Sequence, residues 1–364
     1  MRHAAVPQGQ PSRRGPRPPN ANDRPAAAAN PAHHRTPGYA AIDLGTNNCR
    51  LLIARPEDSK LIVVDAFSRI VRLGEGLQAT GRISAAAMDR AVGALAVCAD
   101  KLRRRHVTLS RAVATEACRR AVNGAELVER VRQETGIALD VIDAAEEARL
   151  AVLGCHSLLE PGDGPALIFD IGGGSTELML VGEADSRVRI DDWISIPWGV
   201  VSLTEYAPVI GDDVAARVAA YERMRSVTRD ALASFAARVA TGTSSAALRL
   251  LGTSGTVTTL ASVFLELPRY DRRAVDGLIG PAEAMRDISA KLAAASLDER
   301  AAFGCIGRER ADLVVAGCAI LEGIMDLWPA TRVGVADRGI REGILRRLAG
   351  FDGDSPVIRR GQPQ

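Results

Sequence analysis

The chain has 364 residues, of which 47% are hydrophobic and 25% charged, and its formal net charge is +2. This composition is typical of a globular protein, and the length predicts two domains. The near-neutral charge argues against a broad nucleic-acid-binding surface, and no run of about eighteen apolar residues predicts a membrane-spanning helix.

The two ends of the chain have little to bury. Residues 1–37 are rich in Pro, Arg and Ala, and we expect a disordered tail without the apolar segment of a secretory signal. Residues 351–364 are expected to form a second, shorter flexible tail. The six cysteines contain no Cys-x-x-Cys pair, which is typical of buried thiols in a cytoplasmic protein and not of a zinc site or a disulfide framework.

Strands alternate with helices after residue 37, which predicts an α/β fold. The elements expected in this first part are, in chain order, a strand–turn–strand over 39–55, a strand over 61–73, a helix over 83–105, a strand over 111–117, a helix over 125–134, a strand over 138–144 and a helix from 146.

The same pattern then restarts. Residues 166–181 again read as strand–turn–strand, and Asp170-Ile171-Gly172 matches Asp43-Leu44-Gly45 of the first hairpin. An internal duplication with two hairpins facing one cleft is the simplest explanation, and chance similarity of two short hairpins is the alternative. The later elements expected are a helix over 213–237, a strand and loop over 248–256, a helix over 309–326 and a strand over 332–337.

The glycine run Gly172–Gly174 follows the strand that carries Asp170. It is not a dinucleotide fingerprint, because Glu177 stands where the third glycine belongs, and no Walker lysine follows. Successive backbone N–H groups in such a loop can cradle phosphate, and Ser175 adds a hydroxyl. Carboxylates on both sides would repel phosphate, so a cation such as Mg²⁺ is implied between them. A plain hairpin with surface carboxylates is the alternative.

Two other loops are candidate anion sites. The segment "DLGTNNC" repeats the arrangement with Asp43, Thr46 and Asn47, although taken alone it could be an ordinary β-turn. The segment "GTSGT", residues 252–256, leads from an apolar run into a helical one. Its backbone could bind an anion at the helix N-terminus, or its hydroxyls could simply cap the helix.

Charged residues between the two hairpins are candidates for chemistry. Arg119 and Arg120 follow a predicted strand, and a guanidinium matches phosphate oxygens, although a solvated pair is the alternative. Glu146 and Glu147 begin the helix that precedes the strand of Asp170. Acids are favoured there by the helix dipole in any case, but one of the two can reach the cleft as a general base.

Seven ordered blocks between residues 39 and 348 together resemble the exopolyphosphatase/guanosine pentaphosphatase family: "AAIDLGTNNCRLLI", "VATEACRRAVNG", "AAEEARLAVLG", "LIFDIGGGSTEL", "GTSGTVTTLA", "ERADLVVAG" and "GIREGIL". The resemblance implies two actin-like, ribonuclease H-like α/β domains of the actin and sugar kinase superfold, over 38–165 and 166–350, with the active site in the cleft between them. The last helix would be able to pack back on the first domain. The chain resembles the short family members, without additional C-terminal helical domains.

By that resemblance, Glu147 takes the position of the catalytic base, and Asp43, Asp170 and Glu177 take the positions around Mg²⁺, or another divalent cation, and the attacking water. The first loop has Thr46 where the family usually has serine, and an alanine replaces the glycine that often precedes the glutamate pair. The implied phosphate-binding residues are Thr46, Asn47, Arg119, Gly172, Gly173, Gly174, Ser175, Ser254, Gly255 and Thr256.

The implied activity is metal-dependent hydrolysis that releases orthophosphate from the ends of inorganic polyphosphate. Two alternatives stay open on the motifs: hydrolysis of the 5′-phosphate of guanosine pentaphosphate (pppGpp), which needs a base-binding pocket, and a non-catalytic sensor of polyphosphate or the alarmone. We expect a cytoplasmic homodimer without nucleic-acid or membrane partners.

Overall fold

The computed structural model describes residues 37–58, 60–162, 164–184, 187–211, 213–242, 248–351 and 357–358. The tail expected over residues 1–37 lies outside this part except for its last residue, as does most of the tail expected over 351–364. Residues Pro37–Gln364 form one compact unit. None of the helices in the described ranges combines the length and apolar character needed to cross a membrane.

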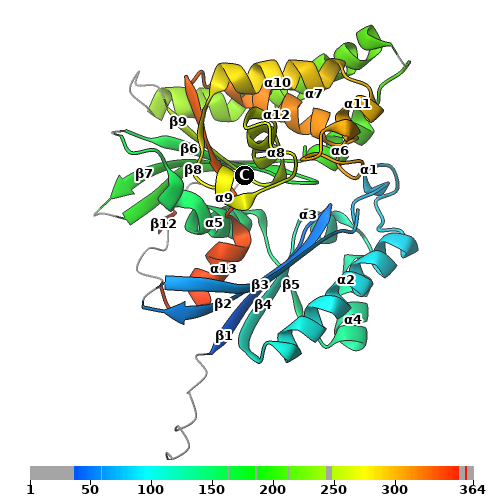
Figure 1. Ribbon diagram of the computed structural model, residues 1–364, viewed down its shortest axis with the longest axis vertical. Helices are drawn as coiled ribbons and strands as arrows, with labels where there is room; N and C mark the ends of the chain where they lie inside the picture. The colour runs from blue at the N-terminus through cyan, green and yellow to red at the C-terminus, as the bar shows by residue number, and fades with distance from the viewer. Residues whose placement is uncertain are drawn as a thin grey trace, which may run out of the picture. The chain divides into compact units, whose positions relative to one another are not determined.

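Two β-sheets organise the chain (Figure 1). Two helices, α2 (Ala85–Arg104) and α4 (Gly124–Thr135), pack on the first sheet and on each other, and their apolar side chains form one core with it. The first sheet contains, in spatial order, β3 (Lys60–Ile70), β2 (Asn48–Glu57), β1 (Gly38–Leu44), β4 (Val107–Ala114) and β5 (Leu139–Val141).

The second sheet is larger. The longest helices that contribute to the apolar core on one of its faces are α7 (Val214–Gly242), α8 (Gly255–Phe264), α10 (Ala282–Ala294) and α12 (Val314–Leu327). Its strands are, in spatial order, β10 (Ile279–Pro281), β11 (Arg332–Ala336), β9 (Arg249–Thr253), β6 (Ala166–Ile171), β7 (Thr176–Ala184), β8 (Arg187–Ile196) and β12 (Val357–Ile358).

The two sheets share a topology. The order β3–β2–β1–β4–β5 in the first is repeated as β8–β7–β6–β9–β11 in the second. In both, the first three strands in sequence are antiparallel neighbours. The last two strands of each order, β4 and β5 in the first sheet and β9 and β11 in the second, add in parallel. The register places Asp43 opposite Arg50 in the first hairpin and Asp170 opposite Glu177 in the second. The predicted α/β fold with two duplicated actin-like halves is confirmed.

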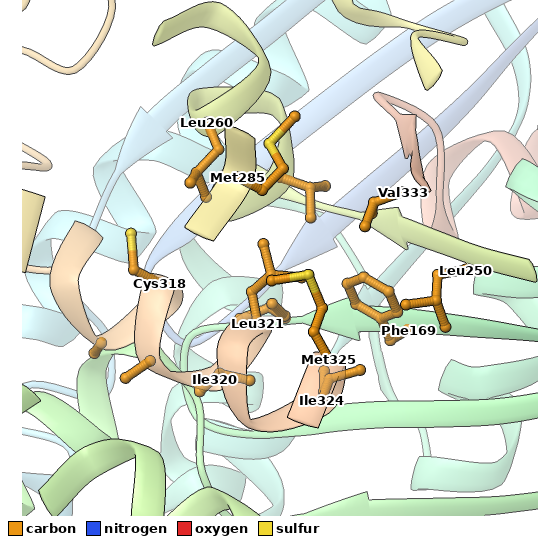
Figure 2. Packing of buried hydrophobic residues seen from close by; sticks show 14 of the residues in the cluster. Phe169, Leu250, Leu260, Met285, Cys318, Ile320, Leu321, Ile324, Met325 and Val333 are labelled. Carbon is orange, nitrogen blue, oxygen red and sulfur yellow. The ribbon is translucent and has the colours of Figure 1, made fainter. Parts of the chain in front are cut away.

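The core of the second sheet explains the most apolar helix of the chain. Figure 2 shows Phe169 and Leu250 of the sheet near Ile324 and Met325 of α12. Every residue of α12 from Val314 to Met325 is buried. A helix that is apolar all round must be enclosed on all sides, and here the sheet, α7 and α10 enclose it. Helix α12 therefore lies in the middle of the apolar core of the second sheet.

Helices α5 (Ala144–Cys155) and α13 (Ile340–Leu348) pack against each other between the two sheets (Figure 1). Two glycines allow this contact, because a Cβ on Gly154 would lie 2.0 Å from the carbonyl oxygen of Gly339 and one on Gly343 would lie 2.1 Å from that of Leu150. One face of α5 packs in the second-sheet cluster with Ile168, and Leu150 packs in the first-sheet cluster. The start of α5 is therefore held by both halves.

Among the predicted boundaries that are wrong, three are wrong because a helix begins elsewhere. The strand expected over 111–117 ends at Ala114, since the carbonyl of Thr115 accepts from the next turn and helix α3 (Glu116–Arg120) follows. The strand expected over 138–144 is cut short because Asp143 caps α5 with its side chain. The helix expected from residue 309 starts only at Val314.

Candidate active site

The two hairpin loops meet tip to tip, and this contact accounts for the glycine run. A Cβ on Gly173 would lie 2.9 Å from Thr46 Cβ and 3.0 Å from the backbone nitrogen of Asn47. A Cβ on Gly174 would lie 2.7 Å from Thr46 Oγ1. Real Cβ atoms almost never come this close to other atoms, so any larger residue would push the loops apart. The glycines are required by close approach of two backbones.

A cavity of about 460 Å³ opens beside these loops. Every residue predicted for the site lines it except Arg119. The predicted residues brought together around the cavity are Asp43, Thr46, Asn47, Glu147, Asp170, Gly172, Gly173, Gly174, Ser175, Glu177, Ser254, Gly255 and Thr256.

The glutamate pair at the start of α5 divides between two environments. Glu147 lines the cavity, and only 7% of its surface is exposed. Glu146 does not line it and instead forms ion pairs with Arg111 at 3.0 Å and Arg347 at 2.5 Å. Consecutive residues point about 100° apart on a helix, so a helix start between two sheets can present only one of them to the cavity. That one is Glu147.

The pKa of Glu147 is raised well above its ordinary value. Burial is the main cause, and the nearby carboxylates of Glu177 and Asp170 add to it, while Arg119 opposes the shift. Atom Oε2 of Glu147 accepts a hydrogen bond from Arg119 at 2.7 Å. No described residue donates to Oε1, so this oxygen is available to a molecule in the cavity.

Among the other carboxylates that line the cavity, burial raises the pKa of Asp43, Asp170 and Glu177. For Glu177 the pKa rises to about 7, with Asp170 as the second cause, although Ser195 Oγ donates to Glu177 Oε1 at 2.8 Å. Ser254 and Arg50 partly oppose the rise in the pKa of Asp170, whose Oδ1 atom is buried without a hydrogen-bond partner in the described part of the chain. Buried acids with unsatisfied oxygens are expected where a cation binds.

The third predicted loop joins β9 to α8. Ser254 has φ 79° and ψ −173°, a conformation that is found almost only in glycine. This turn brings Ser254 close to Asp170 and places the N-terminus of α8 at the cavity, where Gly255 and Thr256 line it. The free N–H groups of a helix start favour an anion there.

Arg119 lies behind Glu147 and outside the cavity lining. Its guanidinium donates from Nη1 to Glu147 Oε2 and to the carbonyl oxygen of Ile142, and from Nη2 to Glu116 Oε2 at 2.9 Å. The cavity lining does not include Arg119, so its assignment as a phosphate ligand stays a prediction.

The profile of the Ppx/GppA phosphatase family matches residues 52–350. This chain belongs to the Ppx/GppA phosphatase family. Exopolyphosphatase 2 of Mycobacterium tuberculosis is 31% identical over 329 residues, which cover 85% of this chain and 98% of that protein. A guanosine-5′-triphosphate,3′-diphosphate pyrophosphatase of Aeromonas hydrophila is 28% identical, and the match covers 88% of this chain but only 61% of that longer relative.

Solved structures of the Ppx/GppA family agree with the fold. A Cytophaga hutchinsonii exopolyphosphatase is 27% identical with a TM-score of 0.77, and the match covers 86% of this chain and 98% of that one. The Aquifex aeolicus member of the family is 28% identical with a TM-score of 0.70, covering 87% and 98%.

Several charged residues of this Ppx/GppA site were not singled out from the sequence. Arg50 and Arg341 line the cavity, and burial together with the charge of Arg341 lowers the pKa of Arg50. The hairpin register could have revealed Arg50, because it lies directly opposite Asp43. Glu116 also lines the cavity. The sequence did not predict this, because residue 116 was expected in a strand and is instead the first residue of helix α3. The remaining unpredicted basic residues of the lining are Arg272, Arg310 and Arg338.

The oxygen-rich lining fits a magnesium ion completed by water and phosphate. Asp170 Oδ1 and Asn47 Oδ1 are both buried and without a hydrogen-bond partner among the described residues. Within the described ranges, no group of three or more His, Cys, Asp or Glu side chains forms a ready-made metal cage. Mg²⁺ usually takes one or two carboxylates and keeps water or substrate oxygens in its other positions, so this donor set suits it.

Proposed function

We propose that this member of the Ppx/GppA family is an exopolyphosphatase that releases orthophosphate hydrolytically from the ends of inorganic polyphosphate. One observation carries the proposal: a buried glutamate at the start of α5, Glu147, lies in the same cavity as two touching hairpin loops and a helix N-terminus. The match over 98% of a relative named exopolyphosphatase 2 supports it.

The terminal phosphates would be held by backbone and hydroxyl donors and not by a lysine. The two hairpin loops and the start of α8 line one cavity, and free backbone N–H groups at such loops and helix starts bind phosphate without a large cost in side-chain entropy. The residues proposed for this role are Thr46, Asn47, Gly172, Gly173, Gly174, Ser175, Ser254, Gly255 and Thr256.

Glu147 would act as the general base through Oε1. A water oxygen attacks the terminal phosphorus, its proton passes to Glu147, and the bond from that phosphorus to the bridging oxygen breaks. The shortened polyphosphate leaves as an anion, so no general acid is required. Phosphoryl transfer needs mostly positioning and charge neutralisation, which this cavity supplies.

We propose that Asp43, Asp170 and Glu177 lie around Mg²⁺, or another divalent cation, and the attacking water, with one or two of the carboxylates bound to the ion directly. When bound, the ion neutralises negative charge on the phosphate oxygens. Removal of divalent ions with EDTA should abolish orthophosphate release, and added Mg²⁺ should restore it. In thermal melts, Mg²⁺ should raise the Tm of the wild type more than that of Asp170→Asn.

The deciding experiment compares orthophosphate release from medium-chain polyphosphate and from pppGpp, with Mg²⁺, for wild type, Glu147→Gln and Glu146→Gln. We expect polyphosphate turnover that Glu147→Gln lowers about 10²–10⁴-fold and that Glu146→Gln largely keeps. Loss of turnover only in Glu146→Gln would move the base. A preference for pppGpp would replace the proposed substrate, and polyphosphate binding without turnover would make the protein a sensor.

Three further expectations complete the proposal. We propose the domain limits 38–165 and 166–350, with α13 packing back on the first sheet, because each sheet has its own apolar core. The six cysteines are free and buried, which supports a cytoplasmic location. The homodimer implied by the family resemblance stays a prediction, which light scattering would test.

A further inference from the structure

Arg119 is held between two carboxylates of the site. It sits in α3 three residues after Glu116, so the helix places the two side chains on the same face. Its guanidinium bonds Glu116 at 2.9 Å and Glu147 at 2.7 Å, and it donates to the carbonyl oxygen of Ile142 at 2.8 Å. Three of the five N–H donors of the arginine are thus used within the protein.

This arrangement is a poor one for binding phosphate. The single positive charge of Arg119 is shared by two carboxylates, and a phosphate that approached it would meet both of their negative charges. Only 19% of the Arg119 side chain is exposed, and the cavity lining does not include it. The two remaining N–H donors belong to a guanidinium whose charge is already neutralised by two ion pairs that are largely removed from water.

The same arrangement is well suited to fixing Glu147. Because Arg119 binds Oε2, the carboxylate is restrained and Oε1 is left without a donor among the described residues. Arg119 in turn cannot rotate freely, because Glu116 holds its other terminal nitrogen. Glu116 reaches the tip of the second glycine loop, where a Cβ on Gly174 would lie 3.0 Å from Glu116 Cγ. Arg119 and Glu116 thereby link the position of Glu147 to that of the second hairpin loop at Gly174.

We infer that Arg119 is a positioning residue for Glu147, oriented by Glu116, and is not a phosphate ligand in this chain. The inference rests on the proposed function of the site. The inference assigns a role to Glu116. Without that role, a carboxylate next to the second hairpin loop would only repel a phosphate substrate. It also makes a kinetic distinction: a lost positioning contact lowers kcat, whereas a lost phosphate contact raises KM.

The test measures kcat and KM for polyphosphate in the wild type, Arg119→Gln, Arg119→Lys, Glu116→Gln and the double variant Glu116→Gln/Arg119→Gln. We expect Arg119→Gln to lower kcat about 100-fold, as displacement of a catalytic group does, while KM changes less than about twofold. Glu116→Gln should lower kcat less, again at constant KM. The double variant should be no worse than Arg119→Gln, because the two residues act in series.

A matched control comes from α4. Glu129 and Arg132 form a Glu–Arg pair with the same three-residue spacing on an exposed helix surface, so Arg132→Gln should leave kcat and KM unchanged. Thermal melts of every variant show which ones fold. If Arg119→Gln does not fold, Arg119→Lys and Glu116→Gln carry the same kcat and KM comparison.

A rise in KM of tenfold or more with nearly constant kcat in the Arg119 variants would overturn the inference, as would additive losses in the double variant. If the wild type does not hydrolyse polyphosphate, the proposed function fails separately. Calorimetric titration of polyphosphate then decides about Arg119: unchanged affinity in Arg119→Gln supports its exclusion as a ligand, and lost affinity refutes it.

Discussion

The contact between the two glycine loops can be tested by adding a single methyl group. In Gly173→Ala the new Cβ would lie 2.9 Å from Thr46 Cβ and 3.0 Å from the backbone nitrogen of Asn47. Ordinary van der Waals contact begins near 3.4 Å, so the loops must separate by about 0.5 Å. The backbone of Asn47 cannot rotate away as a long side chain could. The substitution therefore displaces the hairpin loops that are proposed to bind phosphate.

Two magnitudes follow from this displacement. Overpacking of a rigid contact typically costs about 1–3 kcal/mol, so the free energy of unfolding should fall by that amount. Misplacement of a reacting group by 1 Å can cost about 100-fold in rate, so a shift of half that size should lower kcat/KM by about tenfold or more. Urea denaturation measures the first quantity and orthophosphate release from polyphosphate the second.

Gly93 provides the matched control. It lies inside α2, and a Cβ there would meet nothing within 4 Å. Gly93→Ala should therefore leave kcat/KM unchanged and raise the free energy of unfolding by about 0.5–1 kcal/mol, because alanine loses less backbone entropy in a helix. If Gly173→Ala behaves like Gly93→Ala, the loops do not need close approach and the explanation of the glycine run is wrong.

Two further predictions concern the carboxylates and the third loop. The raised pKa of Glu177, about 7 against an ordinary 4.5, means that between these pH values the folded protein keeps a proton that the unfolded chain has lost. The free energy of unfolding of the metal-free wild type, relative to Glu177→Gln, should therefore fall as pH rises through this range; a relative rise in pH-dependent melts would contradict the environment described for Glu177. Ser254→Gly should relieve the strained φ of 79° and raise the free energy of unfolding by about 1 kcal/mol, yet lower activity, because the cavity loses the Ser254 hydroxyl close to Asp170. Equal activity in that variant would show that this hydroxyl does not matter for turnover.

The duplicated topology was predictable because each half repeats a local pattern. Antiparallel hairpins and alternating strands and helices leave their signals in consecutive residues, so Asp43 and Asp170 could be placed at equivalent hairpin ends. The boundaries that failed depended on side-chain and backbone capping at Thr115 and Asp143. Both residue types are compatible with a strand or a cap, and only the packing of the next helix decides between them.

For the site, the sequence by itself determined which residue types could bind phosphate and cations: the glycine run, the acids beside it and the helix start after "GTSGT". Only the tertiary structure decided which side chains turn inward. In the structure Glu147 lines the cavity, whereas Glu146 forms ion pairs with arginines outside the lining. Arg50 also lines the cavity, whereas Arg119 bonds Glu147 from outside the lining. The physical reason is that motif chemistry is local, whereas the direction of a side chain depends on how α5 is held between two sheets formed by residues far apart in the chain.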